Sequence, residues 1–143
     1  MRWRYADQID AVFLAEWNHR LIREEGHRNR MTVPELADRM RGWLQGEYKA
    51  VIFSSEVAAV GYAVFREETE IVYLRQFFID PESRRRGYGR SGFEILRDAV
   101  WPKDKRLVVE VLCHNPSGIA FWRAMGYTEY CLTLEIMPDV KNA

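Results

Sequence analysis

Four arginines and three glycines gather within residues 84–92, between a strand pattern and a helix pattern. The arginines are Arg84–Arg86 and Arg90, and the glycines are Gly87, Gly89 and Gly92. The N-terminus of a helix offers unpaired N–H groups and a partial positive charge, and glycine lets an anion approach the backbone closely. A solvated turn would need a single glycine or asparagine rather than a cluster of cations. The segment therefore predicts a phosphate-binding loop.

Two other phosphate-binding motifs fit this segment less well. Residues Gly87–Gly92 satisfy the pattern G-x-G-x-x-G, and Glu110 follows Gly92 by 18 residues, near where a dinucleotide site places its ribose-binding acid. In a dinucleotide-binding fold, however, the strand runs straight into the first glycine, whereas the polar residues 80–86 intervene here. A P-loop is excluded because no Gly-Lys-Ser/Thr follows the glycines.

The composition is that of a neutral globular protein. The 143 residues include 21 Lys and Arg against 21 Asp and Glu, so the arginine cluster is a local feature and no nucleic-acid partner is expected. No apolar run approaches the roughly 20 residues that cross a bilayer, and the first residues, MRWRYADQID, lack the apolar core of a signal peptide. Two cysteines are too few for a disulfide framework. We therefore expect a cytoplasmic protein with free thiols and no membrane partner.

The first half of the chain predicts two helices followed by a meander. Apolar residues recur at every fourth position from Ile9 to Leu21, which predicts a helix over about Asp7–Glu25. Thr32 and Glu35 have the spacing of a capping box, so a second helix begins there and closes at Gly46. Three strand patterns follow, joined by short turns, over Lys49–Ser54, Val57–Arg66 and Glu70–Ile79.

The second half of the chain predicts a parallel unit. A helix follows the glycine loop, and after it come a strand, a short helix and a last strand, over Arg106–Cys113, from Asn115 to before Gly126, and over Tyr127–Ile136. In the last strand Tyr130, Leu132, Leu134 and Ile136 share one face. A strand, a crossover helix and a strand form a parallel pair. The chain is thus expected to be one α/β domain, residues 1–143, with a mixed, mostly antiparallel central sheet of about six strands flanked by helices.

Two stretches resemble motifs of the GNAT superfamily, the acetyl-CoA-dependent N-acetyltransferases. FFIDPESRRRGYG resembles motif A, which is Arg/Gln-x-x-Gly-x-Gly/Ala after a strand and falls on Arg84–Gly89. NPSGIAFWRAMGY resembles motif B, in which an asparagine, here Asn115, begins a helix that closes with Gly-Phe or Gly-Tyr. The two N-terminal helices and the meander also fit, so the resemblance covers nearly the whole chain and implies a GNAT-like acyl-CoA N-acyltransferase fold.

The resemblance implies acetyl-CoA as cosubstrate and no metal. In the family, amides of motif A hold the coenzyme A pyrophosphate, and the preceding strand pairs through its backbone with the pantetheine arm where two parallel strands splay apart. The binding residues implied for this chain are Phe77, Phe78, Ile79, Arg84, Arg85, Arg86, Gly87, Tyr88, Gly89, Arg90, Ser91, Asn115 and Trp122.

The chain departs from the family pattern at Trp122. Many members carry a tyrosine at this point of the motif B helix as general acid for the departing thiolate. An indole N–H can donate a hydrogen bond but supplies no proton near neutral pH. Two interpretations stay open: Trp122 packs beside the coenzyme while water or another hydroxyl protonates the thiolate, or the protein is a non-catalytic acyl-CoA sensor or regulatory subunit.

The implied reaction is direct transfer of an acetyl group from acetyl-CoA to a primary amine in a ternary complex. An amine like that of lysine has a pKa of about 10.4, so a base or a water relay must remove a proton before attack. The candidate bases are Glu110, Tyr73 and Glu70. Glu110 is set between apolar residues, and two interpretations of it stay open: a partly buried carboxylate with a shifted pKa, or a solvent-facing or structural acid. The acceptor is expected at residues 18–32, where two glutamates either attract a cationic amine or balance nearby arginines. The identity of the acceptor and a homodimer are left open.

Overall fold

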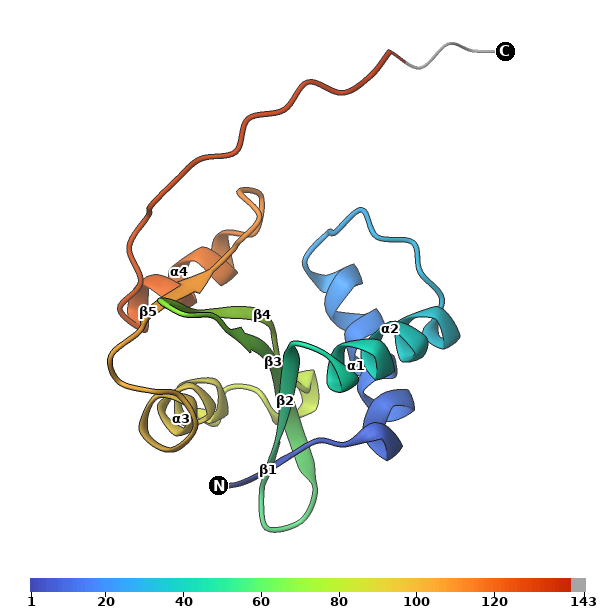
Figure 1. Ribbon diagram of the computed structural model, residues 1–143, viewed down its shortest axis with the longest axis vertical. Helices are drawn as coiled ribbons and strands as arrows, with labels where there is room; N and C mark the ends of the chain where they lie inside the picture. The colour runs from blue at the N-terminus through green and yellow to red at the C-terminus, as the bar shows by residue number, and fades with distance from the viewer. Residues whose placement is uncertain (140–143) are drawn as a thin grey trace.

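A mixed sheet of five strands forms the centre of the protein, whose computed structural model describes residues 1–139 (Figure 1). The strands are β1 (Arg2–Tyr5), β2 (Tyr48–Ser54), β3 (Ala59–Glu67), β4 (Ile71–Ile79) and β5 (Arg106–Val109). They lie side by side in chain order, and all neighbours are antiparallel except β4 and β5, which are parallel. The predicted α/β class and the mostly antiparallel mixed sheet are confirmed.

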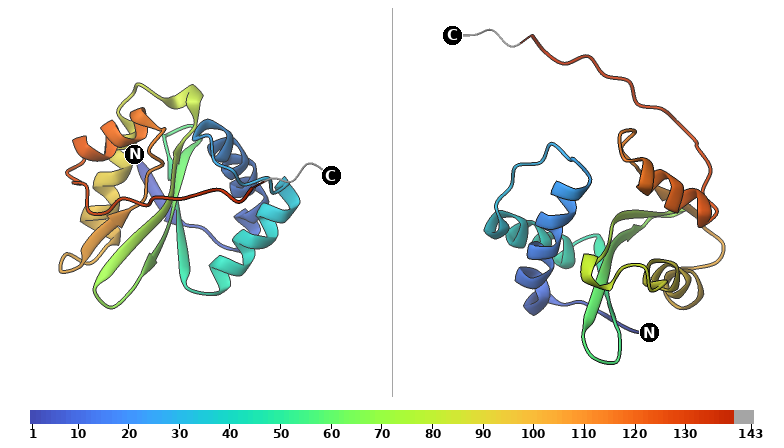
Figure 2. Two further views of the ribbon diagram at one scale, coloured as in Figure 1. Left: turned by 90° about the horizontal axis from the view of Figure 1, so that it is seen from above. Right: turned by 180° about the vertical axis from the view of Figure 1, so that it is seen from behind.

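Helices cover both faces of the sheet (Figures 1 and 2). One face carries α1 (Ala11–Glu24) and α2 (Val33–Gln45), and the other carries α3 (Tyr88–Ile95) and α4 (Pro116–Ala124). Short 3₁₀ turns at Gln8–Asp10 and Pro81–Ser83 precede α1 and the glycine loop, and a π-helical turn at Leu96–Val100 extends α3. Within residues 1–139 no helix combines the length and the apolar content that crossing a bilayer requires.

Two apolar layers hold β4, the strand that leads to the glycine loop. On the α1–α2 face, buried side chains include Leu14, Trp17, Met40, Ile52, Tyr62 and Phe78; on the α3 face they include Phe53, Phe65, Leu74, Phe93, Leu96 and Trp101. Successive residues of a strand point to opposite faces, so β2 sends Ile52 into one layer and Phe53 into the other. Because it is packed from both sides, the sheet is a rigid support for the residues that follow it.

The helix starts follow the local signals in the sequence. The Glu35 N–H donates to Thr32 Oγ1 at 3.3 Å, and the Thr32 N–H donates to the Glu35 carboxylate at 3.0 Å, which confirms the predicted capping box. A β-carbon at Gly92 would lie 3.2 Å from the ring of Phe53, so glycine at this position allows α3 to lie close against β2.

The prediction of the sheet was wrong at its first and last strands. The strand β1 was missed because only four residues form it, and only Trp3 among them is half-buried. The expected last strand, Tyr127–Ile136, is not a strand: no backbone hydrogen bond in the described residues reaches beyond Tyr127. Similarly, β5 ends at Val109 rather than Cys113. Alternating apolar residues predict an extended conformation, but a strand also needs a neighbouring backbone, which the chain does not supply there.

Candidate active site

The strands β4 and β5 pair at their beginnings and then separate. Their pairing runs from Ile71 opposite Arg106 to Leu74 opposite Val109, while β4 continues to Ile79. The β4 ladder to β3 is also irregular here: Phe65 faces Leu74 and Val64 faces Gln76, so Arg75 is an extra residue. Such a bulge bends a strand and redirects its backbone. The result is an open edge on β4 over residues 75–79, as the family resemblance led us to expect.

The glycine loop connects this open edge to the start of α3. Backbone φ is 65° at Arg85 and 76° at Gly87, so the chain passes twice through the left-handed region before the helix begins at Tyr88. The Ser91 N–H donates to the Gly87 carbonyl at 3.0 Å and closes the first helical turn. The N–H groups before Ser91 therefore stand at a helix N-terminus, where backbone donors lack intrahelical partners. A β-carbon at Gly87 would meet no atom within 4 Å, so the space beside it is open.

The four arginines of the loop divide into two groups. Arg84 is engaged by the protein itself: its Nε donates to the Ile79 carbonyl at 2.8 Å, and its Nη2 lies 2.6 Å from the Glu24 carboxylate. The other three, Arg85, Arg86 and Arg90, are exposed and take part in no ion pair within residues 1–139. Three uncompensated cations thus remain at the helix start, while Arg84 joins the loop to α1.

The other residues implied in coenzyme binding surround the open edge. Phe77 points to the α3 face, where its ring centroid lies 5.9 Å from that of Phe121, and Phe78 is buried on the α1 face. A β-carbon at Gly89 would lie 3.1 Å from the ring of Phe121, so this glycine lets α3 approach α4 and leaves no space of its own for a phosphate. Asn115 caps α4, with its Oδ1 accepting from the Gly118 N–H at 3.1 Å.

Trp122 is packed among aromatic rings on the α3 face. Its ring centroid lies 5.3 Å from that of Phe77, 5.7 Å from Phe93 and 5.5 Å from Tyr127, with nearly perpendicular planes. Such edge-to-face contacts hold the indole in place. The position that carries a tyrosine in many family members is therefore part of the apolar layer in this protein.

Trp122→Phe is expected to leave kcat per folded molecule within about threefold of the original, because packing rather than proton transfer is the role that its contacts support. The smaller ring should lower the free energy of unfolding by about 1 kcal/mol, since a cavity replaces part of the indole. Denaturant unfolding and active-site-normalised turnover measure the two effects separately. A large loss of kcat in a normally stable variant would instead assign the indole N–H to the reaction.

Two of the three candidate bases meet where the strands separate. The Tyr73 hydroxyl donates to Glu110 Oε1 at 2.7 Å. Tyr73 lies on β4 opposite Val108 of β5, near the end of the pairing between these strands, and Glu110 directly follows the last residue of β5. Burial, and then the hydrogen bond to Glu110, raise the pKa of Tyr73 well above its usual value. Glu110 itself is exposed, so of the two alternatives left open by the sequence the solvent-facing one holds and partial burial does not. The apolar neighbours of Glu110 are only half-buried because β5 is the last strand of the sheet.

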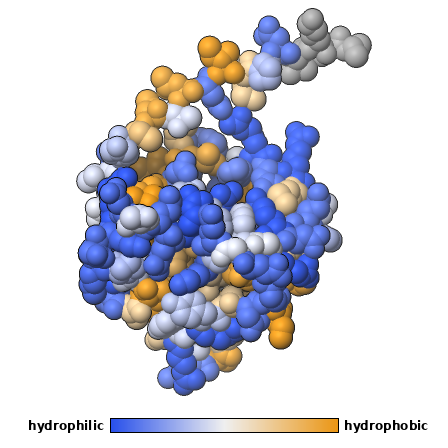
Figure 3. All heavy atoms as spheres, in the orientation of Figure 1, coloured by the Kyte–Doolittle hydropathy of each residue, from blue (hydrophilic) through white to orange (hydrophobic). Residues whose placement is uncertain are grey.

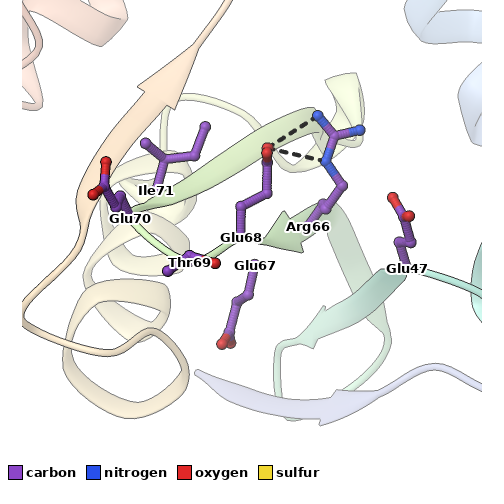
Figure 4. A pocket seen from close by; sticks show the side chains of 7 residues that line it. All are labelled: Glu47, Arg66, Glu67, Glu68, Thr69, Glu70 and Ile71. Carbon is purple, nitrogen blue, oxygen red and sulfur yellow. Dashed lines mark hydrogen bonds and ion pairs between the residues drawn. The ribbon is translucent and has the colours of Figure 1, made fainter.

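Glu70 lies elsewhere. It is in the β3–β4 hairpin, one residue before β4 begins, and lies roughly 30 Å along the strand from Ile79 at about 3.3 Å per residue. There it lines an open hollow of about 760 Å³ together with Glu47, Arg66, Glu67, Glu68, Thr69 and Ile71. The four carboxylates of this hollow point in different directions, and that of Glu68 forms an ion pair with Arg66 (Figure 4). The structure therefore does not bring Glu70 together with the glycine loop.

The end of α1 approaches the site from the other face of the sheet. The Gly26 carbonyl lies 3.3 Å from His114 Nε2, so the α1–α2 loop contacts the loop between β5 and α4. The Glu24 carboxylate forms an ion pair with Arg84. Glu25 is half-buried, and its pKa is raised first by burial and then by the neighbouring charge of Glu24. Its charge also acts on Tyr62, whose hydroxyl donates to Gln76 of β4 at 2.9 Å. The sequence did not separate these two glutamates, because only their tertiary partners differ.

The fold and the site define the class of protein. A model of the acetyltransferase (GNAT) family matches residues 7–127, and the chain therefore belongs to that family. It is an acetyltransferase domain, and the resemblance of its two motifs to this superfamily is confirmed. The matched range includes both the glycine loop and the Tyr73–Glu110 pair.

Solved structures of low sequence identity share the fold. A tetramutant of the BH1408 protein from Bacillus halodurans has a TM-score of 0.80 and 21% identity, covering 96% of this chain and 100% of that chain. Ribosomal-protein-alanine N-acetyltransferase from Brucella melitensis biovar Abortus 2308 has a TM-score of 0.74 and 13% identity, covering 96% and 99%. Aminoglycoside N-acetyltransferase AAC(6')-Iy, in complex with CoA, has a TM-score of 0.75 and 14% identity, covering 96% and 93%. No protein with a curated description matches the chain in sequence.

Proposed function

We propose that the protein transfers an acetyl group from acetyl-CoA to a primary amine by direct attack in a ternary complex. The observation that supports this most is the placement of three features along one strand. The cationic glycine loop follows the end of β4, the open edge of β4 leads back from it, and the Tyr73–Glu110 pair lies where that edge begins. A phosphate-bearing thioester laid along this edge has its acyl end beside a carboxylate.

The residues present fit coenzyme A. Arg85, Arg86 and Arg90, together with the N–H groups at the start of α3, would hold its phosphates, because exposed cations without partners and free backbone donors suit an anion. The open edge of β4 would pair with the amides of the pantetheine arm. The CoA complex of AAC(6')-Iy, which shares the fold, supports the same ligand class. Within residues 1–139 no group of three or more His, Cys, Asp or Glu side chains is arranged to hold a metal ion.

Glu110 is the proposed proton acceptor. A bound ammonium loses a proton to its carboxylate, and the amine nitrogen attacks the thioester carbonyl to give a tetrahedral adduct. The nitrogen of this adduct passes its second proton through water to the sulfur as the C–S bond breaks, which leaves the amide and the free thiol of coenzyme A. Tyr73 is unsuited to be the base because its raised pKa keeps the hydroxyl protonated; it positions Glu110 by its hydrogen bond. A simple thiol has a pKa of about 8.5, so the thiolate can leave with help from water alone. Backbone N–H groups of β4 beyond the pairing with β5 would stabilise the oxyanion.

The acceptor side of the site is proposed to lie between the end of α1 and the open part of β4. Glu25 is the half-buried carboxylate there that forms no ion pair within the described part of the chain, which supports an acceptor with a second positive charge. Two of the solved structures that share the fold, a ribosomal-protein-alanine and an aminoglycoside N-acetyltransferase, are named for different acceptors. We also propose a cytoplasmic location, supported by the two exposed, unpaired thiols of Cys113 and Cys131.

A panel of amines tests this function. Acetyl-CoA is incubated with amino acids, polyamines, aminoglycosides and a peptide with a free N-terminus, and acetylated products are identified by mass spectrometry. We expect turnover with at least one class and faster turnover for acceptors with two cationic groups. Tight binding of acetyl-CoA by calorimetry without turnover on any amine would favour the acyl-CoA sensor instead. Absence of acetyl-CoA binding would contradict both functions.

A further inference from the structure

Two arginines share one aromatic ring on the α1–α2 face of the sheet. The guanidinium carbon of Arg39, on α2, lies 4.3 Å from the centroid of the Trp43 ring, and that of Arg75, on β4, lies 4.7 Å from the same centroid. Arg75 Nη1 also donates to the Tyr48 hydroxyl at 3.3 Å. These four residues are here called the arginine cluster, in which aromatic side chains hold two like charges close together.

Neither cation of the arginine cluster forms an ion pair in the described part of the chain. Three arginines within residues 1–139 are half-buried: Arg41 and Arg66 each pair with a carboxylate, whereas Arg39 does not. Burial, and then the charge of Arg75, lower the pKa of Arg39, because both disfavour a further positive charge at this place. A guanidinium nevertheless stays protonated in proteins, so the cluster keeps two positive charges without a counter-ion.

Arg39 is fixed in position by contacts that leave its charge uncompensated. Its Nη2 donates to Asn18 Oδ1 at 3.2 Å, and Asn18, on α1, is only 1% exposed. Arg39 Nε and Asn18 Nδ2 are buried donors without a hydrogen-bond partner in the described structure. Donors buried without partners are costly, so the surroundings of Arg39 hold more donors than acceptors. A ligand with anionic oxygens beside Arg39 would restore this balance.

The arginine cluster lies next to the Tyr73–Glu110 pair. Arg75 is the extra residue of the β4 bulge and follows Tyr73 by two positions, about 7 Å along the strand. Its charge also acts on the Tyr73 hydroxyl, the group that donates to Glu110. The Arg66 guanidinium lies 5.0 Å from the centroid of the Tyr73 ring, but Glu68 offsets its charge. An anion bound at the cluster is thus within the length of a small molecule from the proposed proton acceptor.

A carboxylate lies at the other end of the acceptor side. Glu25 directly follows α1 and comes seven residues after Asn18, which is two helical turns, so both lie on one face of the helix roughly 10 Å apart along its axis. Asn18 contacts Arg39, and the charges of Glu25 and Arg39 both act on the buried Tyr62 hydroxyl. The space-filling view shows a mostly hydrophilic surface on the α1–α2 side of the molecule (Figure 3). Opposite charges at the two ends favour a polar, zwitterionic ligand over a purely cationic one.

We propose that the acceptor is a diamino carboxylic acid whose carboxylate is bound by Arg39 and Arg75. The proposal rests on the acetyl transfer proposed above and adds the class of its acceptor. One amine of the acceptor lies at Glu110 and is acetylated, the carboxylate accepts hydrogen bonds from the two guanidinium groups, and the second ammonium lies at Glu25. Guanidinium groups suit this role because their forked N–H donors match the two oxygens of a carboxylate.

Aromatic stacking by itself does not account for the second arginine. One guanidinium is enough for a cation–π contact with Trp43, whereas a second one at the same ring adds repulsion between like charges. A carboxylate of the acceptor gives both arginines a function and removes the repulsion. A phosphate on the acceptor would also satisfy two cations, so the experiment compares the two anions.

Matched pairs of acceptors test the proposal. Turnover of acetyl-CoA is measured with lysine and ornithine, and with cadaverine and putrescine, the diamines that lack their carboxylate. We expect kcat/KM to be about tenfold or more higher for the amino acid of each pair, because the diamine loses the charge-assisted hydrogen bonds to the arginines. Phosphoethanolamine, an amine that carries a phosphate, should be a poorer acceptor than either amino acid.

Two arginine variants connect this preference to the cluster. Arg75→Gln should lower the preference for lysine over cadaverine about tenfold, through a higher KM for lysine, and should fold normally because Arg75 is exposed. Arg39→Gln should act in the same direction, and thermal unfolding checks its fold. Arg41→Gln is the matched control: it removes the same charge from a half-buried arginine of α2 that pairs with Asp38, and it should keep the preference.

The outcomes separate this proposal from the acetyl transfer on which it rests. Equal or faster turnover of the diamines would overturn the carboxylate site and leave the acetyl transfer in place. A preference for the amino acids that survives in both Arg75→Gln and Arg39→Gln would also overturn it, since the carboxylate would then bind elsewhere. Faster turnover of phosphoethanolamine than of lysine would overturn it in favour of a phosphate-bearing acceptor. Absence of turnover with every amine would overturn both proposals.

Discussion

Glu110→Gln is expected to lower kcat at pH 7 by about 100-fold, the lower end of what a positioned acid or base contributes. An amide cannot accept a proton from the bound ammonium, whereas it keeps the size of the carboxylate and can still accept the hydrogen bond that Tyr73 donates at 2.7 Å. The loss should shrink as the pH rises. Free amine increases about tenfold per pH unit below the amine pKa of about 10.4, so a base becomes unnecessary. Turnover between pH 6.5 and 10 measures this recovery.

Two further variants distinguish a catalytic role of Glu110 from a structural one. Tyr73→Phe should cost only about tenfold, because it removes the hydrogen bond that orients Glu110 and leaves the carboxylate. Glu47→Gln, which neutralises an exposed carboxylate in the hollow at the other end of β4, should have no effect. An equal loss for Glu110→Gln at every pH would make Glu110 structural. A larger loss for Tyr73→Phe than for Glu110→Gln would make the tyrosine, or a water held by it, the proton carrier.

Reversing two of the unpaired arginines, Arg86→Glu/Arg90→Glu, is expected to weaken acetyl-CoA binding by about 100-fold or more. A hydrogen bond to a charged group contributes about 1.5–3 kcal/mol, so the loss of two corresponds to about 3 kcal/mol or more. Both side chains are exposed and take part in no ion pair of the described structure, so the fold should be unaffected. Calorimetric titration with acetyl-CoA measures the dissociation constant.

A charge-matched variant separates local contacts from the general field of the protein. Arg2→Glu/Lys49→Glu changes the net charge equally at exposed positions of β1 and β2, strands that β3 separates from β4 and the glycine loop, and should bind acetyl-CoA almost normally. The affinity of the original protein should also fall as salt rises, and more steeply than that of Arg86→Glu/Arg90→Glu, because salt screens exposed charges. Equal weakening in both double variants would argue against a phosphate site at this loop.

Local patterns in the sequence determined most of the elements of this protein. Three local patterns reflect interactions between residues close in sequence: the four-residue spacing from Ile9 to Leu21, the Thr32–Glu35 capping box and the strand patterns up to Ile79. The structure contains each of the elements that they predict. The position of the glycine loop and its affinity for an anion could also be predicted, because arginines and glycines before a helix restrict what can bind there. The family followed from the same two motifs, and the family match confirms it.

Other properties depended on partners far away in the chain, which no local pattern encodes. Arg84 and Arg86 are the same residue type in the same loop, but only Arg84 forms an ion pair with Glu24 of α1. Glu70 and Glu110 both flank apolar strands, but only the parallel pairing of β4 with β5 brings Tyr73 to Glu110. The alternation over Tyr130–Ile136 correctly indicates an extended chain, yet pairing requires a second backbone at hydrogen-bonding distance. The sequence by itself therefore determined conformation and residue chemistry, and the tertiary structure decided which side chains meet and which edges stay open.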